Sequence, residues 1–174
     1  LPRASFWTSF RTSIIRVLLG GSLNLFFIIL TAYPLSKSND KLHFRNVYTW
    51  YFFITMLVSG GMIPNYLLIA KLGLLDTFWA NIVPLLATPV GVFLIKQFID
   101  GLPDALIEAA YIDGANDYQI LFKIIMPLIK PALATLTIMT FQSAWGATEA
   151  STLLINNENY KNFAFYLSTL SANG

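Results

Sequence analysis

Four long stretches without a charged residue restrict the fold of this chain more than any other feature. They are Val17–Ser36, Val47–Ala70, Thr77–Ile95 and Pro131–Thr148. A helix needs about 20 residues to cross the ~30 Å hydrocarbon core of a bilayer, and each stretch is close to that length. Because backbone polar groups in lipid must be satisfied inside the protein, apolar runs of this length predict helices and not barrel strands.

The composition argues against a soluble helix bundle. Hydrophobic residues make up 56% of the chain and charged residues only 11%, whereas soluble domains carry about 25% charged residues. Four apolar helices would therefore lack a polar coat in water. We predict an all-α, polytopic membrane protein with a single transmembrane domain over residues 1–174. Its spans are predicted at about 14–36, 47–70, 77–97 and 128–148, with a polar loop at about 98–127.

Several kinds of site are excluded by what the sequence lacks. The absence of cysteine excludes disulfides, thiol nucleophiles and cysteine-ligated metals. A single histidine without an acidic cluster argues against a catalytic metal. A net charge of +2 and the lack of a basic run interleaved with aromatic residues argue against nucleic-acid binding. We therefore predict no catalytic residue, no metal site and no nucleic-acid partner.

Proline and glycine interrupt the predicted spans. Prolines stand at positions 34, 64, 84, 89 and 131, and Gly60-Gly61 adds a flexible point in the second span. Such interruptions are tolerated where neighbouring helices or a cavity satisfy the backbone. They favour a gated pathway over a structural anchor for a cytoplasmic complex, with irregular packing in a bundle as the alternative.

Basic residues in short loops predict the orientation. The loops after the first and third spans carry three Lys or Arg each, whereas the loop after the second holds only Lys71, balanced by Asp76. The first and third loops are therefore predicted to be cytoplasmic. Arg3, Arg11 and Arg16 precede the first charge-free stretch and would lie outside, against this rule.

The polar loop before the fourth span contains five acids and the signals of ordered structure. Pro103 suits the start of a helix, and acidic residues follow in its early turns. Gly114 can adopt positive φ and end that helix in a sharp turn. Asn116 or Asp117 can cap a second helix. Two short helices joined at a glycine are predicted.

The same loop resembles a known family motif. Glu108-Ala109-Ala110, Asp113-Gly114-Ala115 and Ile125-Met126-Pro127 resemble the EAA loop of bacterial ABC-importer permease subunits, in which EAA, three residues, glycine and about nine residues precede I-x-L-P. Met126 stands where the family usually has leucine. Pro64-Asn65-Tyr66 followed by Leu72–Thr77 resembles the carbohydrate-importer branch related to the maltose permease subunits. Ser59–Pro64 resembles the subgroup linked to oligosaccharides or uronate-containing saccharides.

The resemblance implies a type I ABC-importer permease fold in the bacterial inner membrane, with several spans and the loop as a cytoplasmic coupling helix. Members of this branch normally have six spans, so the four here would be the second to the fifth. The start at Leu1 and the abrupt end at Gly174 agree with an internal piece of a longer chain.

The resemblance also implies partners and docking residues. The loop would dock on an ATPase subunit through Glu108, Ala109, Ala110, Asp113, Gly114, Ala115 and Pro127. Alanines allow close approach, and the acids can pair with basic residues of the partner. The expected partners are two cytoplasmic ATP-binding subunits, a second and homologous permease subunit, an extracytoplasmic solute-binding protein and the lipid bilayer. The chain lacks a Gly-x-x-x-x-Gly-Lys-Ser/Thr motif, so ATP and Mg are expected on the ATPase and this chain is not expected to be an enzyme.

A substrate pathway is predicted from polar and aromatic residues in or near the spans: Gln142, Trp145, Asn81, Tyr66 and Glu149. Polar groups in lipid are costly and suggest a cavity, where Trp145 can stack on a sugar ring and Gln142 can bind its hydroxyls. The alternative for each is an interhelical hydrogen bond or an aromatic belt. The family's fifth span ends in Trp-Asn-acid-aromatic, and Trp145-Gly146-Ala147-Thr148-Glu149 departs from that pattern.

Two other transport functions remain open. One is an ABC-importer permease for a solute such as spermidine, phosphate or an amino acid, which would keep the loop and change the cavity. The other is a secondary transporter or channel without an ATPase. That class predicts an acid or base inside the membrane, and the charge-free stretches argue against it.

Overall fold

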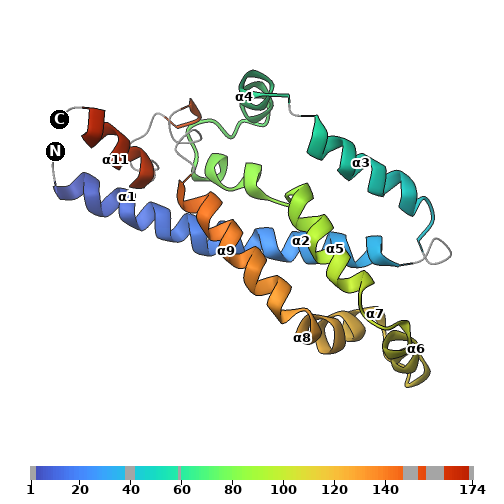
Figure 1. Cartoon of the computed structure of the whole chain (residues 1–174). Helices are drawn as coiled ribbons and strands as arrows, with labels where there is room; N and C mark the ends of the chain where they lie inside the picture. The colour runs from blue at the N-terminus through green and yellow to red at the C-terminus, as the bar shows by residue number, and fades with distance from the viewer. Residues whose placement is uncertain (1–2, 38–41, 59, 147–152, 156–162, 173–174) are drawn as a thin grey trace. The chain divides into compact units, whose positions relative to one another are not determined.

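The computed structural model describes residues 3–37, 42–58, 60–146, 153–155 and 163–172 (Figure 1). These residues form helices and loops without a strand, which confirms the predicted all-α class. In chain order the elements are α1 (Arg3–Ile15), the π-helix η1 (Arg16–Gly20), α2 (Gly21–Ser36), α3 (Arg45–Leu57), α4 (Met62–Lys71), the 3₁₀ turns η2 (Phe78–Asn81) and η3 (Val83–Leu85), α5 (Pro89–Asp100), α6 (Asp104–Ile112), α7 (Asp117–Gln119), the π-helix η4 (Ile120–Ile125), α8 (Met126–Leu128), α9 (Lys130–Gly146) and α11 (Phe163–Ala172).

One described helix, Phe6–Ser36, is by itself long and apolar enough to cross a membrane. Three further spans reach this length only if each interrupted pair counts as one: Arg45–Leu57 with Met62–Lys71, Phe78–Leu85 with Pro89–Asp100, and Asp117–Leu128 with Lys130–Gly146. Arg16 lies inside the first helix and not before it, because the charge-free stretch is only the later part of that helix. One interruption contains the predicted breaker Gly60-Gly61. Pro89 is the first residue of α5, directly after another interruption, whereas Pro34 stays within α2.

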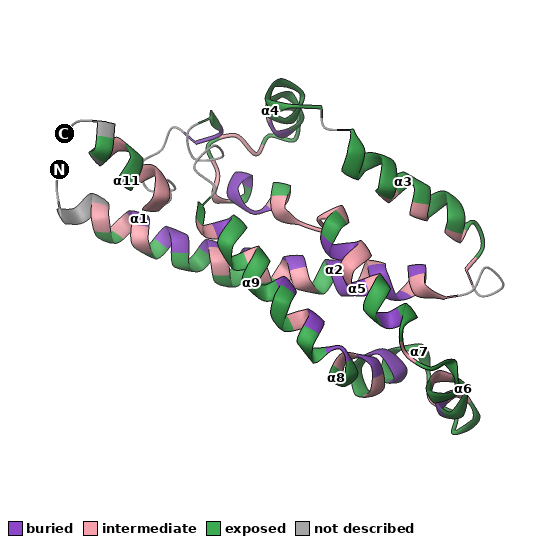
Figure 2. Ribbon diagram, viewed as in Figure 1, coloured by how far each residue is buried: buried purple, intermediate pink, exposed green. Residues whose placement is uncertain are grey.

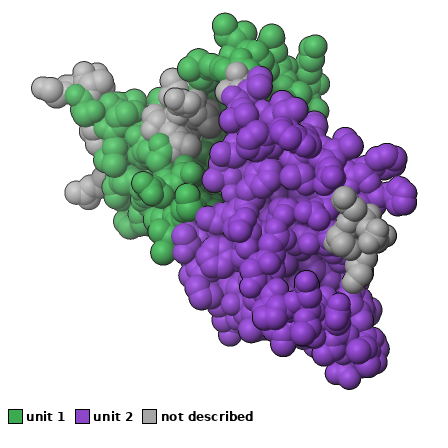
Figure 3. Space-filling view, turned by 45° about the vertical axis from the view of Figure 1, so that its right-hand side comes forward, with its two compact units in different colours: residues 1–24, 59–86, 138–174 green, residues 25–58, 87–137 purple. Residues whose placement is uncertain are grey.

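The chain divides into two compact units, coloured separately in Figure 3. The unit of residues 25–58 and 87–137 contains the polar loop. Its core joins α2, α5, α6, η4 and α9 through buried side chains that include Ile28, Val92, Ala110, Ile125 and Leu136. Apolar side chains on α3 stay largely exposed (Figure 2), which suits a helix whose outer side contacts lipid.

In this unit α5 approaches its neighbours closely at Gly91. A Cβ atom there would lie 2.5 Å from Ile28 Cδ1 and 3.1 Å from Leu136 Cδ1. Small residues permit such approach between membrane helices. Glycine at this position therefore allows α5 to pack against both α2 and α9.

Gly91→Leu is expected to destabilise the protein, because overpacking a core costs about 1–3 kcal/mol or more. The melting temperature of the detergent-solubilised protein should fall clearly. Gly101→Leu is the matched control, since a Cβ at Gly101 would meet its nearest neighbour at an ordinary 3.6 Å. Equal melting temperatures for the two variants would show that α5 has room to shift.

The second unit contains residues 1–24, 59–86 and 138–174. Its described residues include a small core of Ile69, Ala80, Leu154 and Ile155. Helix α1 packs against α11 through aromatic rings, and the backbone N–H of Phe163 donates to Ser13 Oγ at 2.7 Å.

Candidate functional site

The polar loop folds as a helix, a glycine turn and a second helix. The second helix, Asp117–Leu128, consists of α7, η4 and α8. Helix α6 follows Pro103, and Gly114 adopts a φ of +79°, as predicted. The N–H of Gly114 donates to the carbonyl of Tyr111 at 3.0 Å, and that of Ala115 donates to the carbonyl of Ala110 at 2.9 Å. This pair of bonds is a Schellman motif, in which a left-handed residue closes the helix end. Glycine is favoured there because it has no Cβ to clash.

A capping box begins the second helix, and its cap is Asn116, one of the two residues predicted for that role. Asn116 Oδ1 accepts from the N–H of Gln119 at 2.9 Å, and Gln119 Oε1 accepts from the N–H of Asn116 at 3.0 Å. Reciprocal caps of this kind satisfy two backbone donors at once. Both sides of the glycine turn are thus held by hydrogen bonds, so the loop has a defined geometry.

The predicted docking residues divide into exposed and packed groups. Exposed are Glu108, Ala109, Asp113, Gly114 and Pro127. Ala110 is only 6% exposed and belongs to the core, and Ala115 packs against that core. In this structure the small side chains of these two alanines serve packing within the chain.

The open side of α6 contains two residues that the sequence analysis did not select. Ala105, Ala109 and Ile112 are spaced four and three apart, so they share one side of the helix. All three are exposed, and Ile112 is 86% exposed. Helical spacing could have identified them, because Ala105, Ala109 and Ile112 lie on a different side of the helix from the packed residues Ile107 and Ala110. The acids Glu108 and Asp113 flank this open side.

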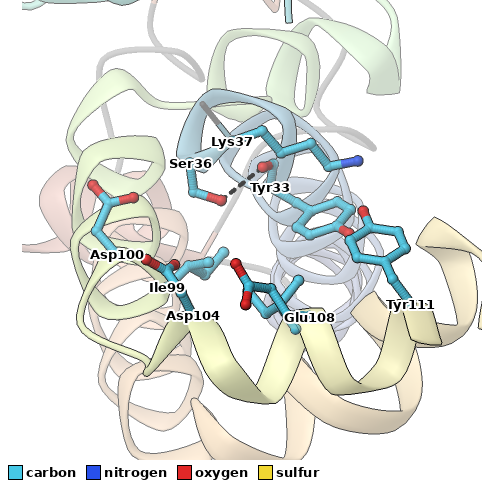
Figure 4. Close-up of a pocket in the computed structure, with 9 residues that line it drawn as sticks. Tyr33, Ser36, Lys37, Ile99, Asp100, Asp104, Glu108 and Tyr111 are labelled. Atoms are coloured by element: carbon cyan, nitrogen blue, oxygen red, sulfur yellow. Dashed lines mark hydrogen bonds between the residues drawn. The ribbon is translucent and has the colours of Figure 1, made fainter. Parts of the chain in front are cut away.

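Glu108 borders a polar cavity of about 280 Å³ on the other side of α6 (Figure 4). Its lining residues come from the end of α2, the end of α5 and α6: Tyr33, Ser36, Lys37, Ile99, Asp100, Asp104, Ile107, Glu108 and Tyr111. Asp100 forms an ion pair with Lys96 within α5. Among the described residues no group of three or more His, Cys, Asp or Glu could hold a metal ion. The cavity therefore offers carboxylates to a basic or hydrogen-bonding group.

Asp117, considered from sequence only as a helix cap, joins the loop to α2. Its carboxylate contacts Lys37, Tyr111 and Tyr33. The hydrogen bond from Lys37, and next that from Tyr111, hold the pKa of Asp117 below its usual range, although partial burial opposes them. The carboxylate therefore stays ionised at neutral pH.

The residues predicted for the substrate pathway have different surroundings. Gln142 is exposed in a shallow hollow with Met139, Ser143 and Gly146 on α9. Trp145 is half-buried among aromatic rings, stacked on Phe141 at a centroid distance of 5.9 Å. The three-residue spacing thus does not give Gln142 and Trp145 one common environment.

Of the remaining pathway residues, Asn81 is fully buried and Tyr66 is 40% exposed on α4. Glu149 lies outside the described residues. Asn24, a polar residue of the first span, makes interhelical contacts: its amide donates to the Leu85 carbonyl and its oxygen accepts from Thr140 Oγ1 at 3.1 Å.

A polar side of the first long helix was missed by the sequence analysis. Its members recur at helical spacing and are all less than 9% exposed: Ser9, Thr12, Ser13, Arg16 and Asn24. Because Arg16 is charged, it was predicted to lie outside, before the first charge-free stretch. Polar and ionisable groups buried in a membrane helix are costly and tend to line functional cavities.

Comparisons with known proteins agree with this geometry. A family model described as "Binding-protein-dependent transport system inner membrane component" matches residues 5–166. Protein LplC of Bacillus subtilis (strain 168) is 39% identical over 153 residues, which cover 88% of this chain and 51% of that protein. The polygalacturonan/rhamnogalacturonan transport system permease protein YtcP of the same organism is 36% identical, over 87% of this chain and 52% of that protein. The chain spans about half the length of these curated relatives.

A solved structure is also similar. The crystal structure of a bacterial ABC transporter involved in the import of the acidic polysaccharide alginate matches with a TM-score of 0.89 at 35% identity. The match covers 95% of this chain and 58% of that chain. These findings confirm the resemblance to ABC-importer permease subunits and the type I permease fold. The chain belongs to the family of inner membrane components of binding-protein-dependent transport systems.

Proposed function

We propose that this chain is part of the membrane-spanning subunit of an ATP-driven importer, and that it forms part of the translocation pathway for an oligosaccharide. The observation that carries the proposal is the ordered helix–glycine–helix loop in a chain of this transport family. The hydrogen bonds on both sides of Gly114 hold this loop in one geometry, so it can present a fixed surface to a partner.

The loop is proposed to dock on a cytoplasmic ATPase subunit as a coupling helix. Ala105, Ala109 and Ile112 form an open apolar strip on α6, where the two alanines permit close approach of a partner and Ile112 offers apolar surface. Glu108 and Asp113, at its flanks, can form charge-assisted hydrogen bonds with Arg or Lys of the ATPase. Gly114, Ala115 and Ala110 shape the turn, and exposed Pro127 lies near the end of the second helix.

The assembly is proposed to contain two ATP-binding subunits, a second and homologous permease subunit, and an extracytoplasmic solute-binding protein. ATP and Mg would be bound by the ATPase subunits, and the permease would lie in the bacterial inner membrane with several spans. Closure of the ATPase dimer would move the loop and drive a rigid-body change of access. The interruptions between the paired helices are places where such motion can be absorbed.

The proposed substrate class is an acidic oligosaccharide. Support comes from two similar proteins, one named for polygalacturonan and rhamnogalacturonan and one involved in alginate import. Within this chain the pathway would use Gln142, Trp145, Asn81, Tyr66 and Glu149. The buried polar side of the first long helix is a further candidate, because such groups are stable in a membrane only where they find partners or a cavity.

Reconstitution of the full-length complex tests this proposal. ATP hydrolysis in proteoliposomes should rise when the binding protein is loaded with oligogalacturonate or oligoalginate, and less with neutral oligosaccharides of equal length. Stimulation by a polyamine, phosphate or an amino acid instead would support the alternative of a non-sugar importer. Solute uptake independent of ATP would contradict the importer class.

A further inference from the structure

We propose that Asp117 is a positioning residue that ties the polar loop to the C-terminal end of α2, so that movement of the loop is passed to that helix. The inference rests on the proposed function, because it names the connection through which a docked ATPase would act on this membrane helix. All residues involved belong to one compact unit.

One carboxylate oxygen gathers donors from two other parts of this unit. Tyr111, near the end of α6, donates to Asp117 Oδ1 at 2.5 Å, and Tyr33 on α2 donates to it at 3.2 Å. Lys37 Nζ, directly after α2, lies 2.6 Å from the same oxygen. The Lys37 ammonium also lies 4.6 Å from the centre of the Tyr33 ring. Asp117 is thus the shared acceptor of three side chains.

Apolar packing places the loop against α2. Ala110 and Ile120 from the loop share a core cluster with Ile29 and Tyr33 from α2. Interdigitated side chains in such a cluster set the fit of the two helices. Hydrogen bonds to a single oxygen are directional and charge-assisted. The Asp117 contacts therefore add a directional, charge-assisted link between loop and helix to the register that packing sets.

The solvent exposure of the Asp117 side chain distinguishes a positioning role from a purely stabilising one. The Asp117 side chain is 51% exposed and that of Lys37 is 17% exposed. Ion pairs with an exposed partner contribute little to overall stability. Loss of the Asp117 contacts should therefore appear in coupling between ATP hydrolysis and transport, and much less in assembly of the complex.

The test measures solute imported per ATP hydrolysed by the full-length complex in proteoliposomes. Asp117→Ala should assemble at the wild-type level, hydrolyse ATP, and import about five-fold less solute per ATP or worse. Asp117→Glu should restore part of the ratio. Adding Tyr33→Phe or Tyr111→Phe to Asp117→Ala should lower the ratio less than the same change does in the wild type, because each hydroxyl donates to Asp117.

Lys96→Met is the matched control. It also removes a lysine–aspartate pair, but the pair of Lys96 with Asp100 lies within α5 and joins no second element. Its import per ATP should equal that of the wild type.

An assembled Asp117→Ala complex with the wild-type ratio would overturn the inference. If Asp117→Ala fails to assemble, the Tyr33→Phe/Tyr111→Phe double variant is measured instead, because it keeps both aromatic rings and removes only the hydroxyls. A wild-type amount of solute imported per ATP in this double variant would also overturn the inference. A wild-type complex without substrate-stimulated hydrolysis would instead overturn the proposed function, and with it this inference.

Discussion

Gly114→Val is expected to leave the complex in the membrane but to reduce substrate-stimulated ATP hydrolysis strongly. Gly114 has a φ of +79°, in the region where an L-residue is strained by about 1–2 kcal/mol and a β-branched residue is a clear outlier. Valine would relax by opening the turn, which breaks the bonds from Gly114 to Tyr111 and from Ala115 to Ala110. The angle between α6 and the second helix would then change.

The measurement is substrate-stimulated hydrolysis in the reconstituted full-length complex, which should fall at least about ten-fold if coupling energies are of the usual size. Gly114→Asn is the graded comparison, because asparagine tolerates left-handed backbone and should retain part of the stimulation. Gly101→Val is the control, since Gly101 has an ordinary φ of −81° at the end of α5. Normal stimulation in Gly114→Val would mean that the turn geometry is not used in coupling.

Glu108→Lys is expected to weaken association with the ATPase subunit. Glu108 is exposed at the edge of the open side of α6, where it can pair with a basic residue of the partner. Reversal replaces that attraction with repulsion, which costs on the order of several kcal/mol if the contact is desolvated. Recovery of ATPase with the tagged permease after detergent extraction should therefore drop.

Two further variants make this result specific. Asp104 lies one helical turn earlier and also borders the cavity, and Asp104→Lys changes the net charge by the same amount. An equal loss of recovered ATPase with this variant would indicate long-range electrostatic repulsion and not a contact at Glu108. A compensating acid in the ATPase groove should restore part of the binding to Glu108→Lys. Unchanged recovery of the ATPase with Glu108→Lys would mean that Glu108 faces solvent or the cavity beside it and does not contact the ATPase.

Local backbone chemistry explains why much of the loop was predictable. Positive φ at Gly114, the cap at Asn116 and the start of α6 after Pro103 depend on residues at most a few positions apart. The family motif is likewise a short linear pattern with fixed spacing. Charge-free runs predicted membrane helices for the same reason, because lipid imposes a length and a composition on each segment separately.

Side-chain partners distant in sequence could not be predicted in this way. Ala110 and Ala109 are equivalent as letters of a motif, yet one packs in the core and the other is exposed. Trp145 fits a sugar platform by composition, but the structure surrounds it with Phe10, Phe141 and Phe163. Which side of a helix is covered depends on neighbours that helical spacing alone does not identify.

The sequence by itself therefore determined the membrane class, the family and the helix–glycine–helix form of the loop, since each follows from local composition, spacing or backbone preference. Only the tertiary structure decided which loop residues remain open to a partner and which pack inward. It alone also placed Arg16 within a buried polar side of the first helix. Asp117 meets Tyr33 across 84 positions of sequence, because hydrophobic packing of the intervening helices brings the two together and no local pattern encodes that meeting.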